Sequence, residues 1–208
     1  MLLSKPEIVK MFRKVAALWQ ENKVYLSDID SRFGDGDHGV TIGKIAGLIE
    51  KKLDAWEDED IETFLEDLGD STMEIGGGSA GPLYGTMISG LSDPLSGTDA
   101  IGAQTLKEMF AGSLSAMEDI TTAKVGDKTM MDALIPAVAA AQAAEDDCKA
   151  ILEAAREAAV KGARDSEQYI SKFGRARSYK EQTIGTPDAG AVSTSLFFIG
   201  LCDGYQEA

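Results

Sequence analysis

Apolar residues recur at three- and four-residue spacing along almost the whole chain, and this spacing constrains the fold more than any other feature. It is typical of helices that bury one face. Alternating runs of Val, Ile and Thr between turn signals are absent from the sequence, as are Asn-Gly hairpin signals, so strands are not expected. The spacing predicts an all-α fold of about eight helices. They cover residues 6–23, 39–55, 60–75, 82–92, 103–119, 128–143, 147–171 and 189–205.

Glycine and aspartate gather in the predicted connections between these helices. A length of 208 residues suits one domain, spanning 1–208. Connections on a helical scaffold are exposed and commonly carry binding and catalytic residues, so we expect the functional residues there. The connections are 34–39, 76–81, 93–102, 120–127 and 174–190.

A net charge of −15 at pH 7 argues against nucleic acids and anionic membrane surfaces as partners, because both are bound through basic patches. No apolar run approaches the roughly 20 residues that a membrane span needs. No signal-peptide pattern opens the sequence, which favours the cytoplasm. Cys148 and Cys202 form no Cys/His ligand pattern and are interpreted as buried thiols.

The segment from Asp30 to Gly39 holds three carboxylates and the only histidine of the chain. Gly34 and Gly36 tolerate left-handed backbone, so a tight turn can bring Asp30 toward Asp35 and Asp37. Mg²⁺ prefers oxygen ligands, and a cation would relieve the repulsion among three carboxylates. The same residues also suit a solvated acidic loop in which Asp37 caps the next helix. From this segment alone, metal binding and capping both stay open.

The spacing excludes an EF-hand. That calcium-binding loop requires oxygen ligands at its first, third and fifth positions and glutamate at the twelfth. With Asp28 first, the fifth position is Arg32, and with Asp35 first it is Gly39. Neither register supplies the ligands.

A second glycine-rich segment runs from Gly76 to Thr86 and contains a formal G-x-G-x-x-G pattern. It follows a predicted helix rather than a strand, which argues against a Rossmann dinucleotide site, and it lacks the Gly-Lys-Ser/Thr ending of a Walker loop. Backbone N–H groups at a helix start can bind phosphate, and Ser79 adds a hydroxyl donor. A flexible helix connector is an equally good interpretation.

Two further helix starts complete the pattern. In the segment 126–130 we interpret Asp127 as an N-cap and Lys128 as a point charge. The loop 174–191 carries Arg175 and Arg177 in a strongly acidic chain, and arginine suits phosphate oxygens. Asp188 is a candidate metal ligand, a ribose contact or the N-cap of the last helix.

Together these four segments, in this order, resemble the family of nucleotide-binding L subunits of bacterial dihydroxyacetone kinase. The same domain forms the C-terminal half of single-chain, ATP-dependent dihydroxyacetone kinases. The resemblance spans essentially the whole chain, and the combination of motifs is far more specific than any one of them. It rests on residues 34–39, 77–86, 126–130, 174–176, 184–185 and 188–191.

The resemblance implies an eight-helix antiparallel barrel with the nucleotide held by loops at one end. It implies that Asp30, Asp35 and Asp37 coordinate two Mg²⁺ ions that bridge the phosphates of ADP or ATP. Gly77, Gly78 and Ser79 would offer N–H and hydroxyl donors to phosphate. The other implied nucleotide contacts are His38, Gly39, Val40, Thr41, Ala80, Met130, Arg175, Asp188, Ala189 and Gly190.

A chain of this length resembles the separate subunit of the phosphotransferase-system enzyme. In that enzyme, bound ADP is rephosphorylated by a phosphohistidine-carrying M subunit and then phosphorylates dihydroxyacetone held on a K subunit. We assign His38 to orientation of phosphate or substrate rather than to covalent phosphate carriage. No residue is assigned as a general acid or base, since phosphoryl transfer depends on positioning and charge neutralisation.

Several positions depart from the family pattern. Val40-Thr41-Ile42 follows Gly39, Ala80 replaces a serine, and residues 177–183 and 188–191 differ in the third loop. These differences leave open a related kinase subunit for another short ketose or polyol, using free ATP. A third interpretation, from another class, is a nucleotide-responsive protein that binds a transcriptional regulator. A homodimer is compatible with each of these interpretations.

Overall fold

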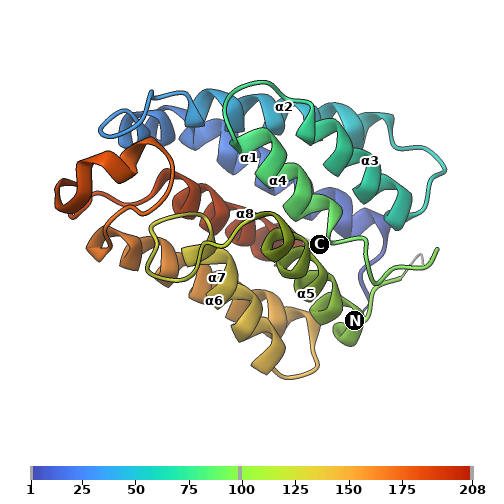
Figure 1. The fold of residues 1–208 in the computed structure, drawn as a ribbon. Coiled ribbons are helices and arrows are strands. Elements are labelled where there is room, and N and C mark those ends of the chain that lie inside the picture. Colours follow the sequence, from blue (N-terminus) through green and yellow to red (C-terminus); the bar gives the residue numbers. More distant parts are fainter. Residues whose placement is uncertain (1, 98–99, 207–208) are drawn as a thin grey trace.

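The computed structural model describes residues 2–97 and 100–206, and within them the chain is helical, as predicted. The described residues contain no strand, only an isolated bridge between Leu3 and Ile101. The helices pack as an antiparallel bundle (Figure 1). They are α1 (Lys5–Asp30), α2 (His38–Ala55), α3 (Ile61–Met73), α4 (Ala80–Ser89), α5 (Ala103–Ile120), α6 (Met131–Ala143), α7 (Cys148–Asp165) and α8 (Ala189–Gln206), with 3₁₀ segments η1 (Ser166–Gln168) and η2 (Arg175–Thr183).

Local signals explain where several helices begin. Ser4 and Glu7 form a capping box at the start of α1, in which side chains satisfy backbone N–H groups that have no partner within the helix. The Asp60 side chain accepts the Thr63 N–H at 2.8 Å at the start of α3, and Asp147 does the same for α7.

Four helix boundaries differ from the predicted ones by three residues or more, including that of α4, which ends at Ser89 rather than at 92. Helix α1 continues seven residues beyond the predicted end at 23, because Leu26 and Ile29 extend its buried face. Helix α7 ends at Asp165 rather than at 171, where the chain turns into η1. Helix α6 begins at Met131 rather than at 128, because Lys128 has a φ of 60° that a right-handed helix does not accept.

Helix α8 lies directly against α1 because two glycines let the backbones approach. A Cβ on Gly200 would lie 2.6 Å from the Val15 Cα, and one on Gly204 would lie 2.6 Å from the Met11 Cα. The two helices run in opposite directions, since Gly204 faces the earlier turn of α1. Buried aromatic rings then fill the core around this pair, with Phe197 of α8 against Phe12 of α1 at a centroid distance of 6.0 Å.

Four of the five predicted connections gather at one end of the bundle, the end where α1 finishes. The α1–α2 turn and η2 lie together at the left of Figure 1, with the loop before α6 beside them. The fifth connection, 93–102, belongs to the opposite end, because Ile101 pairs with Leu3 just before α1 begins. Its residues 98 and 99 lie outside the described residues. Among the described helices, none combines the length and apolarity that crossing a membrane would require.

Candidate nucleotide and metal site

A cleft of about 340 Å³ opens at the end where the connections gather. It is lined by residues from each of the motif segments singled out in the sequence. These are the α1–α2 turn, the glycine-rich segment before α4, the segment before α6, the loop leading into η2, and the start of α8. The fold therefore brings together segments that are up to about 160 residues apart in the chain, as an antiparallel bundle with functional loops at one end should.

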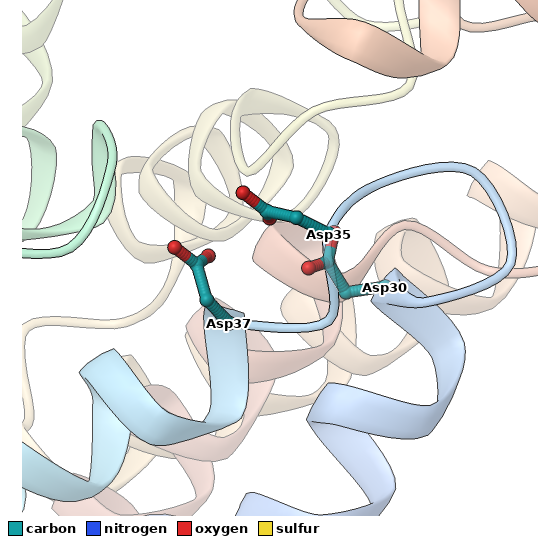
Figure 2. Close-up of side chains that lie close together, drawn as sticks. All are labelled: Asp30, Asp35 and Asp37. Atoms are coloured by element: carbon teal, nitrogen blue, oxygen red, sulfur yellow. The ribbon is translucent and has the colours of Figure 1, made fainter.

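Three carboxylates from the α1–α2 turn converge at the cleft (Figure 2). Asp30 is the last residue of α1, Asp35 lies in the turn, and Asp37 precedes α2. One oxygen atom from each carboxylate lies within 4.8 Å of the others. Gly36 has a φ of 75°, so the turn uses the left-handed conformation that glycine accepts without strain.

The Asp37 side chain does not cap α2, which was one of the two roles left open by the sequence. Asp37 occupies the N-cap position of α2, but its backbone is helical and its side chain makes no cap hydrogen bond. The His38 N–H instead points toward Asp30 Oδ2, at 3.4 Å. The Asp37 carboxylate is therefore directed into the acidic group rather than back onto its own helix.

The three negative carboxylates lie close enough to change one another's pKa. Burial, the charge of Asp35, a hydrogen bond with Asp35 and the charge of Asp30 raise the pKa of Asp37. For Asp35, desolvation acts upward, but its own backbone N–H, the Arg175 guanidinium and Asp37 leave the pKa below its usual value. Three carboxylates held this close repel one another, and their oxygen atoms are a suitable donor set for a hard divalent cation.

The glycine-rich segment lies next to this acidic group. Gly77 and Gly78 both have positive φ, at 137° and 66°, and a Cβ on Gly78 would lie 3.9 Å from Asp37 Oδ2. Ser79 holds the N-cap position of α4 without a side-chain cap bond and is exposed in the cleft. The first N–H groups of α4 have no partner within the helix, and such groups favour anions.

Arg175 connects the third loop to the acidic turn. Its guanidinium forms an ion pair with Asp35, and 69% of the side chain remains exposed. It lies at the cleft beside Phe173 and Gly174. An exposed arginine at this position can exchange a carboxylate for a phosphate without losing buried contacts.

The segment before α6 is held by residues other than the predicted ones. Asp127 does not cap α6; it accepts the Lys124 N–H at 2.8 Å and pairs with Lys172 at 2.6 Å. Asp132 is fully buried and instead binds the segment, accepting the N–H groups of Gly126 and Thr129, each at 2.6 Å. The predicted cap was wrong because the helix starts three residues later than its apolar pattern suggests.

Lys128 is a structural clamp rather than an exposed charge. It is 5% exposed, and its Nζ donates to the carbonyl oxygens of Ser166 at 2.5 Å and Thr186 at 2.6 Å. Burial lowers its pKa, while Asp188, Asp132 and Glu167 act in the opposite direction. Through these bonds Lys128 joins the end of α7 and the loop before α8 to the segment that carries Met130.

Of the three roles considered for Asp188, the structure shows helix capping. Its Oδ1 accepts the Ala191 N–H at 2.8 Å, and its own N–H donates to Ser166 Oγ at 2.9 Å. Burial raises the pKa of this carboxyl to about 7, with Asp132 and Asp30 adding to the effect and Lys128 opposing it. Asp188 lines the cleft but lies outside the acidic group formed by Asp30, Asp35 and Asp37.

His38 is half-buried and faces α8. Its Nε2 lies 2.8 Å from Ser193 Oγ, and burial lowers its pKa to about 4 against the opposing effects of Asp30 and the Ala189 carbonyl. Ser193 Oγ in turn contacts the Tyr84 hydroxyl at 2.7 Å. Sequence reasoning missed Tyr84 and Ser193. The one available signal was the polar run 193–195 inside an otherwise apolar helix.

Most of the residues predicted to bind nucleotide or metal line the cleft, and three do not. Gly39 packs against the Lys23 carbonyl, where a Cβ would overlap it, and Thr41 is buried with its hydroxyl donating to the Gly77 carbonyl at 3.2 Å. Val40 is 55% exposed and lies outside the cleft lining. The lining includes Asp30, Asp35, Asp37, His38, Gly77, Gly78, Ser79, Ala80, Met130, Arg175, Asp188, Ala189 and Gly190.

The DAK2 domain family matches residues 32–203 of the chain. The ADP-binding subunit DhaL of the PEP-dependent dihydroxyacetone kinase of Escherichia coli (strain K12) is 29% identical over 202 residues, which cover 96% of this chain and 95% of that protein. The L-erythrulose kinase of Pectobacterium atrosepticum is 30% identical over 180 residues, covering 84% of this chain and 30% of that protein. The crystal structure of the dihydroxyacetone kinase of C. freundii in its native form has a TM-score of 0.73 at 26% identity, covering 94% of this chain and 34% of that one.

Proposed function

Because the chain belongs to the DAK2 domain family, we propose that it is the ADP-binding subunit of a dihydroxyacetone kinase. Both relatives described above are kinases by name, and the chain spans 95% of the E. coli ADP-binding subunit. The structural observation that carries the proposal is the convergence of three carboxylates at a cleft that also contains a glycine-lined helix start and an exposed arginine.

The acidic group fits a magnesium site by its chemistry. Asp30, Asp35 and Asp37 offer only oxygen atoms, and one oxygen from each lies within 4.8 Å of the others. These residues would hold two Mg²⁺ ions, as the family resemblance implies. Bound magnesium offsets the charge of the nucleotide phosphates and of the transferring phosphoryl group.

The remaining cleft residues divide into a polar and an apolar part. Gly77, Gly78 and Ser79 with the start of α4 would hold phosphate, and Arg175 would turn from Asp35 to the phosphate oxygens. Met130 and the Asp188 to Gly190 segment would contact the nucleoside, and Leu83 adds an apolar side chain to the cleft lining. Gly39 and Thr41 would act by packing α2 against α1 and Gly77, while Val40 stays a predicted contact.

In this proposal the chain carries the phosphoryl group between two partners. A phosphohistidine-bearing M subunit would phosphorylate bound ADP, and a K subunit would present dihydroxyacetone to the resulting ATP. The name of the E. coli relative, a PEP-dependent kinase, supports this donor. His38 would orient rather than carry phosphate, since its Nε2 is engaged by Ser193 inside the protein.

A second candidate acceptor is a four-carbon ketose. The observation that favours it is the similarity to L-erythrulose kinase, which covers 84% of this chain. The loop 174–191, in which residues 177–183 and 188–191 depart from the family pattern, flanks the cleft through Gly174 and Arg175 and would face the acceptor. Parallel assays with dihydroxyacetone and erythrulose would separate the two acceptors.

The test is native mass spectrometry of the freshly purified full chain. We expect a mass that includes one ADP and two Mg²⁺, and we expect the ADP to leave when the same sample is dialysed against a chelator. Adding back ADP with Mg²⁺, but not ADP alone, should restore the complex. A chain that neither retains nor rebinds ADP in the presence of Mg²⁺ would contradict the proposal.

A further inference from the structure

The hydroxyl group of Tyr84 is the centre of a buried hydrogen-bonded cluster beneath the cleft. Tyr84 is 1% exposed, and its hydroxyl lies 3.1 Å from the Gly190 carbonyl oxygen, 2.7 Å from Ser193 Oγ and 2.9 Å from Thr194 Oγ1. Its ring packs edge-on against Trp19 at a centroid distance of 5.2 Å. With the ring held in this way, the hydroxyl has a fixed position between α4 and the first turns of α8.

Ser193 extends this cluster to His38. The Ser193 hydroxyl lies 2.8 Å from the Ala189 carbonyl oxygen, and His38 Nε2 lies 2.8 Å from the same Oγ. A serine hydroxyl has one proton to donate and two lone pairs. Because Ser193 Oγ also lies 3.2 Å from the Gly190 carbonyl oxygen and 2.7 Å from the Tyr84 hydroxyl, the tautomer of His38 decides which atom donates in the contact with Nε2. In either tautomer this contact sets the ring orientation of His38 from α8.

The cluster joins three helix starts that each contribute to the cleft. His38 begins α2, Tyr84 belongs to the first turns of α4, and Gly190 belongs to the first turn of α8; all three residues line the cleft. Hydroxyl groups elsewhere in the bundle bond to one neighbouring element, as Ser113 of α5 does to the Met87 carbonyl oxygen of α4 at 2.7 Å, or only within their own helix. Ser195, for example, donates to Val192 O at 2.7 Å, and Thr72 donates to Leu68 O at 2.7 Å.

We propose that Tyr84 and Ser193 are positioning residues of the nucleotide site: their hydroxyl groups hold His38 and Gly190 at a fixed separation, so that the cleft is preformed for the nucleotide. This inference rests on the proposed function. It also explains why a polar cluster stands where apolar side chains would pack, since buried hydroxyl groups that are fully paired specify one arrangement of their neighbours.

The test compares Tyr84→Phe and Ser193→Ala with Ser195→Ala, a control that removes a hydroxyl from the same helix without touching the cluster. The dissociation constant for ADP with Mg²⁺ should rise about tenfold in Tyr84→Phe and Ser193→Ala, which is the loss expected for one buried hydrogen bond. It should stay within about twofold in Ser195→Ala. The double variant should lose little more than either single variant, because both hydroxyl groups act through the same contact.

A second measurement does not need nucleotide. His38 is the only histidine of the chain, so its ring nitrogen resonances can be assigned without ambiguity in the intact protein. The Nε2 resonance should shift in Tyr84→Phe and Ser193→Ala but not in Ser195→Ala. A merely structural role would lower the melting temperature without this selective change at His38.

The outcomes separate the two proposals. If the wild-type chain binds ADP with Mg²⁺ while the cluster variants keep its affinity and its His38 resonances, the positioning role is overturned and the proposed function stands. If the variants lose affinity only in proportion to lost thermal stability, the positioning role is also overturned. If the wild-type chain does not bind ADP, both proposals fall.

Discussion

Two groups of aspartates lie at the same end of the molecule, yet their carboxylates have different partners. Asp132 and Asp188 accept backbone N–H groups at 2.6–2.8 Å and thereby hold the loops before and at the start of helices. Asp30, Asp35 and Asp37 face one another, Asp35 pairs with Arg175, and the His38 N–H lies 3.4 Å from Asp30 Oδ2. Even Asp37, at an N-cap position, makes no cap bond.

The difference teaches how to separate structural from functional acids in one loop cluster. A carboxylate that accepts backbone N–H bonds satisfies groups which would otherwise be unpaired, so its removal costs stability. Carboxylates held together with few such donors repel one another. Removing one of them should leave the fold intact and abolish only the binding of a cation.

The largest expected effect is that of Asp37→Ala on nucleotide binding. Loss of one of three carboxylate ligands should weaken Mg²⁺-dependent ADP binding by about a thousandfold, more than the 10- to 100-fold typical of outer-shell changes. Calorimetric titration with and without Mg²⁺ measures this. Asp28→Ala removes an exposed carboxylate near the end of α1, outside the acidic group, and should bind normally. If Asp37→Ala binds ADP with Mg²⁺ as tightly as the wild type, the acidic group has no binding role and does not differ from Asp132 and Asp188 in function.

Asp132→Ala should produce the opposite result, a loss of stability. It leaves the N–H groups of Gly126 and Thr129 without their acceptor, at a cost of about 2–3 kcal/mol. The melting temperature should fall by about 4–12 °C. Asp35→Ala, measured in the same metal-free buffer, should melt within about 2 °C of the wild type. Equal destabilisation by the two changes would contradict the comparison.

Arg175→Gln tests the cation that contacts the acidic group. Its ion pair with Asp35 is exposed, and such pairs contribute at most about 1 kcal/mol, so the melting temperature should barely change. If the guanidinium transfers to phosphate, ADP affinity should fall about tenfold. Arg177→Gln is the matched control, because Arg177 belongs to the same loop but lies outside the cleft lining. Equal affinities in both variants would leave Arg175 without a binding role.

The smallest expected effect is a pH dependence of stability that arises from Asp188. Its pKa in the folded chain is raised to about 7, above the value of about 4 expected when unfolded. The folded state then holds the proton more tightly, so this contribution is fully present below about pH 4 and is lost as the pH rises to about 7. Asp188→Asn should flatten the difference in urea stability between pH 6.5 and pH 8 by about 0.8 kcal/mol. An unchanged difference would exclude Asp188 as its source.

The fold was predictable because apolar periodicity reports which face of a helix is buried. Helix α2, predicted over 39–55, spans His38–Ala55. The helix boundaries were predicted wrongly where a tertiary contact changes the backbone inside the apolar pattern. The apolar pattern 128–143 began three residues before α6 itself, since Lys128 adopts a left-handed backbone to reach two carbonyl oxygens. Nothing in the local sequence reports those acceptors, which lie 38 and 58 residues away.

The site was predictable to the extent that it consists of loop motifs. The acidic turn could be singled out because three aspartates and two glycines within eight residues are rarely needed for a turn alone. Whether Asp188 caps a helix or binds a ligand could not be decided, because both roles use the same residue between a proline and a helix. The cluster of Tyr84 and Ser193 forms only because the tertiary structure places α4 next to the first turns of α8. The local sequence does not show this contact.

The close contact of α1 with α8 has a mechanical consequence. Gly200 rests on Val15 in the interior of the bundle, while Asp30 and Gly190 lie near the ends of the two helices that meet at the cleft. Ten residues of helix between Gly200 and Gly190 form an arm about 15 Å long. A tilt of only about 5° at the pivot would move the tip by about 1.3 Å, enough to misalign reacting groups. The alignment of the residues that line the cleft therefore depends on the absence of side chains at Gly200 and Gly204, which lie away from the cleft.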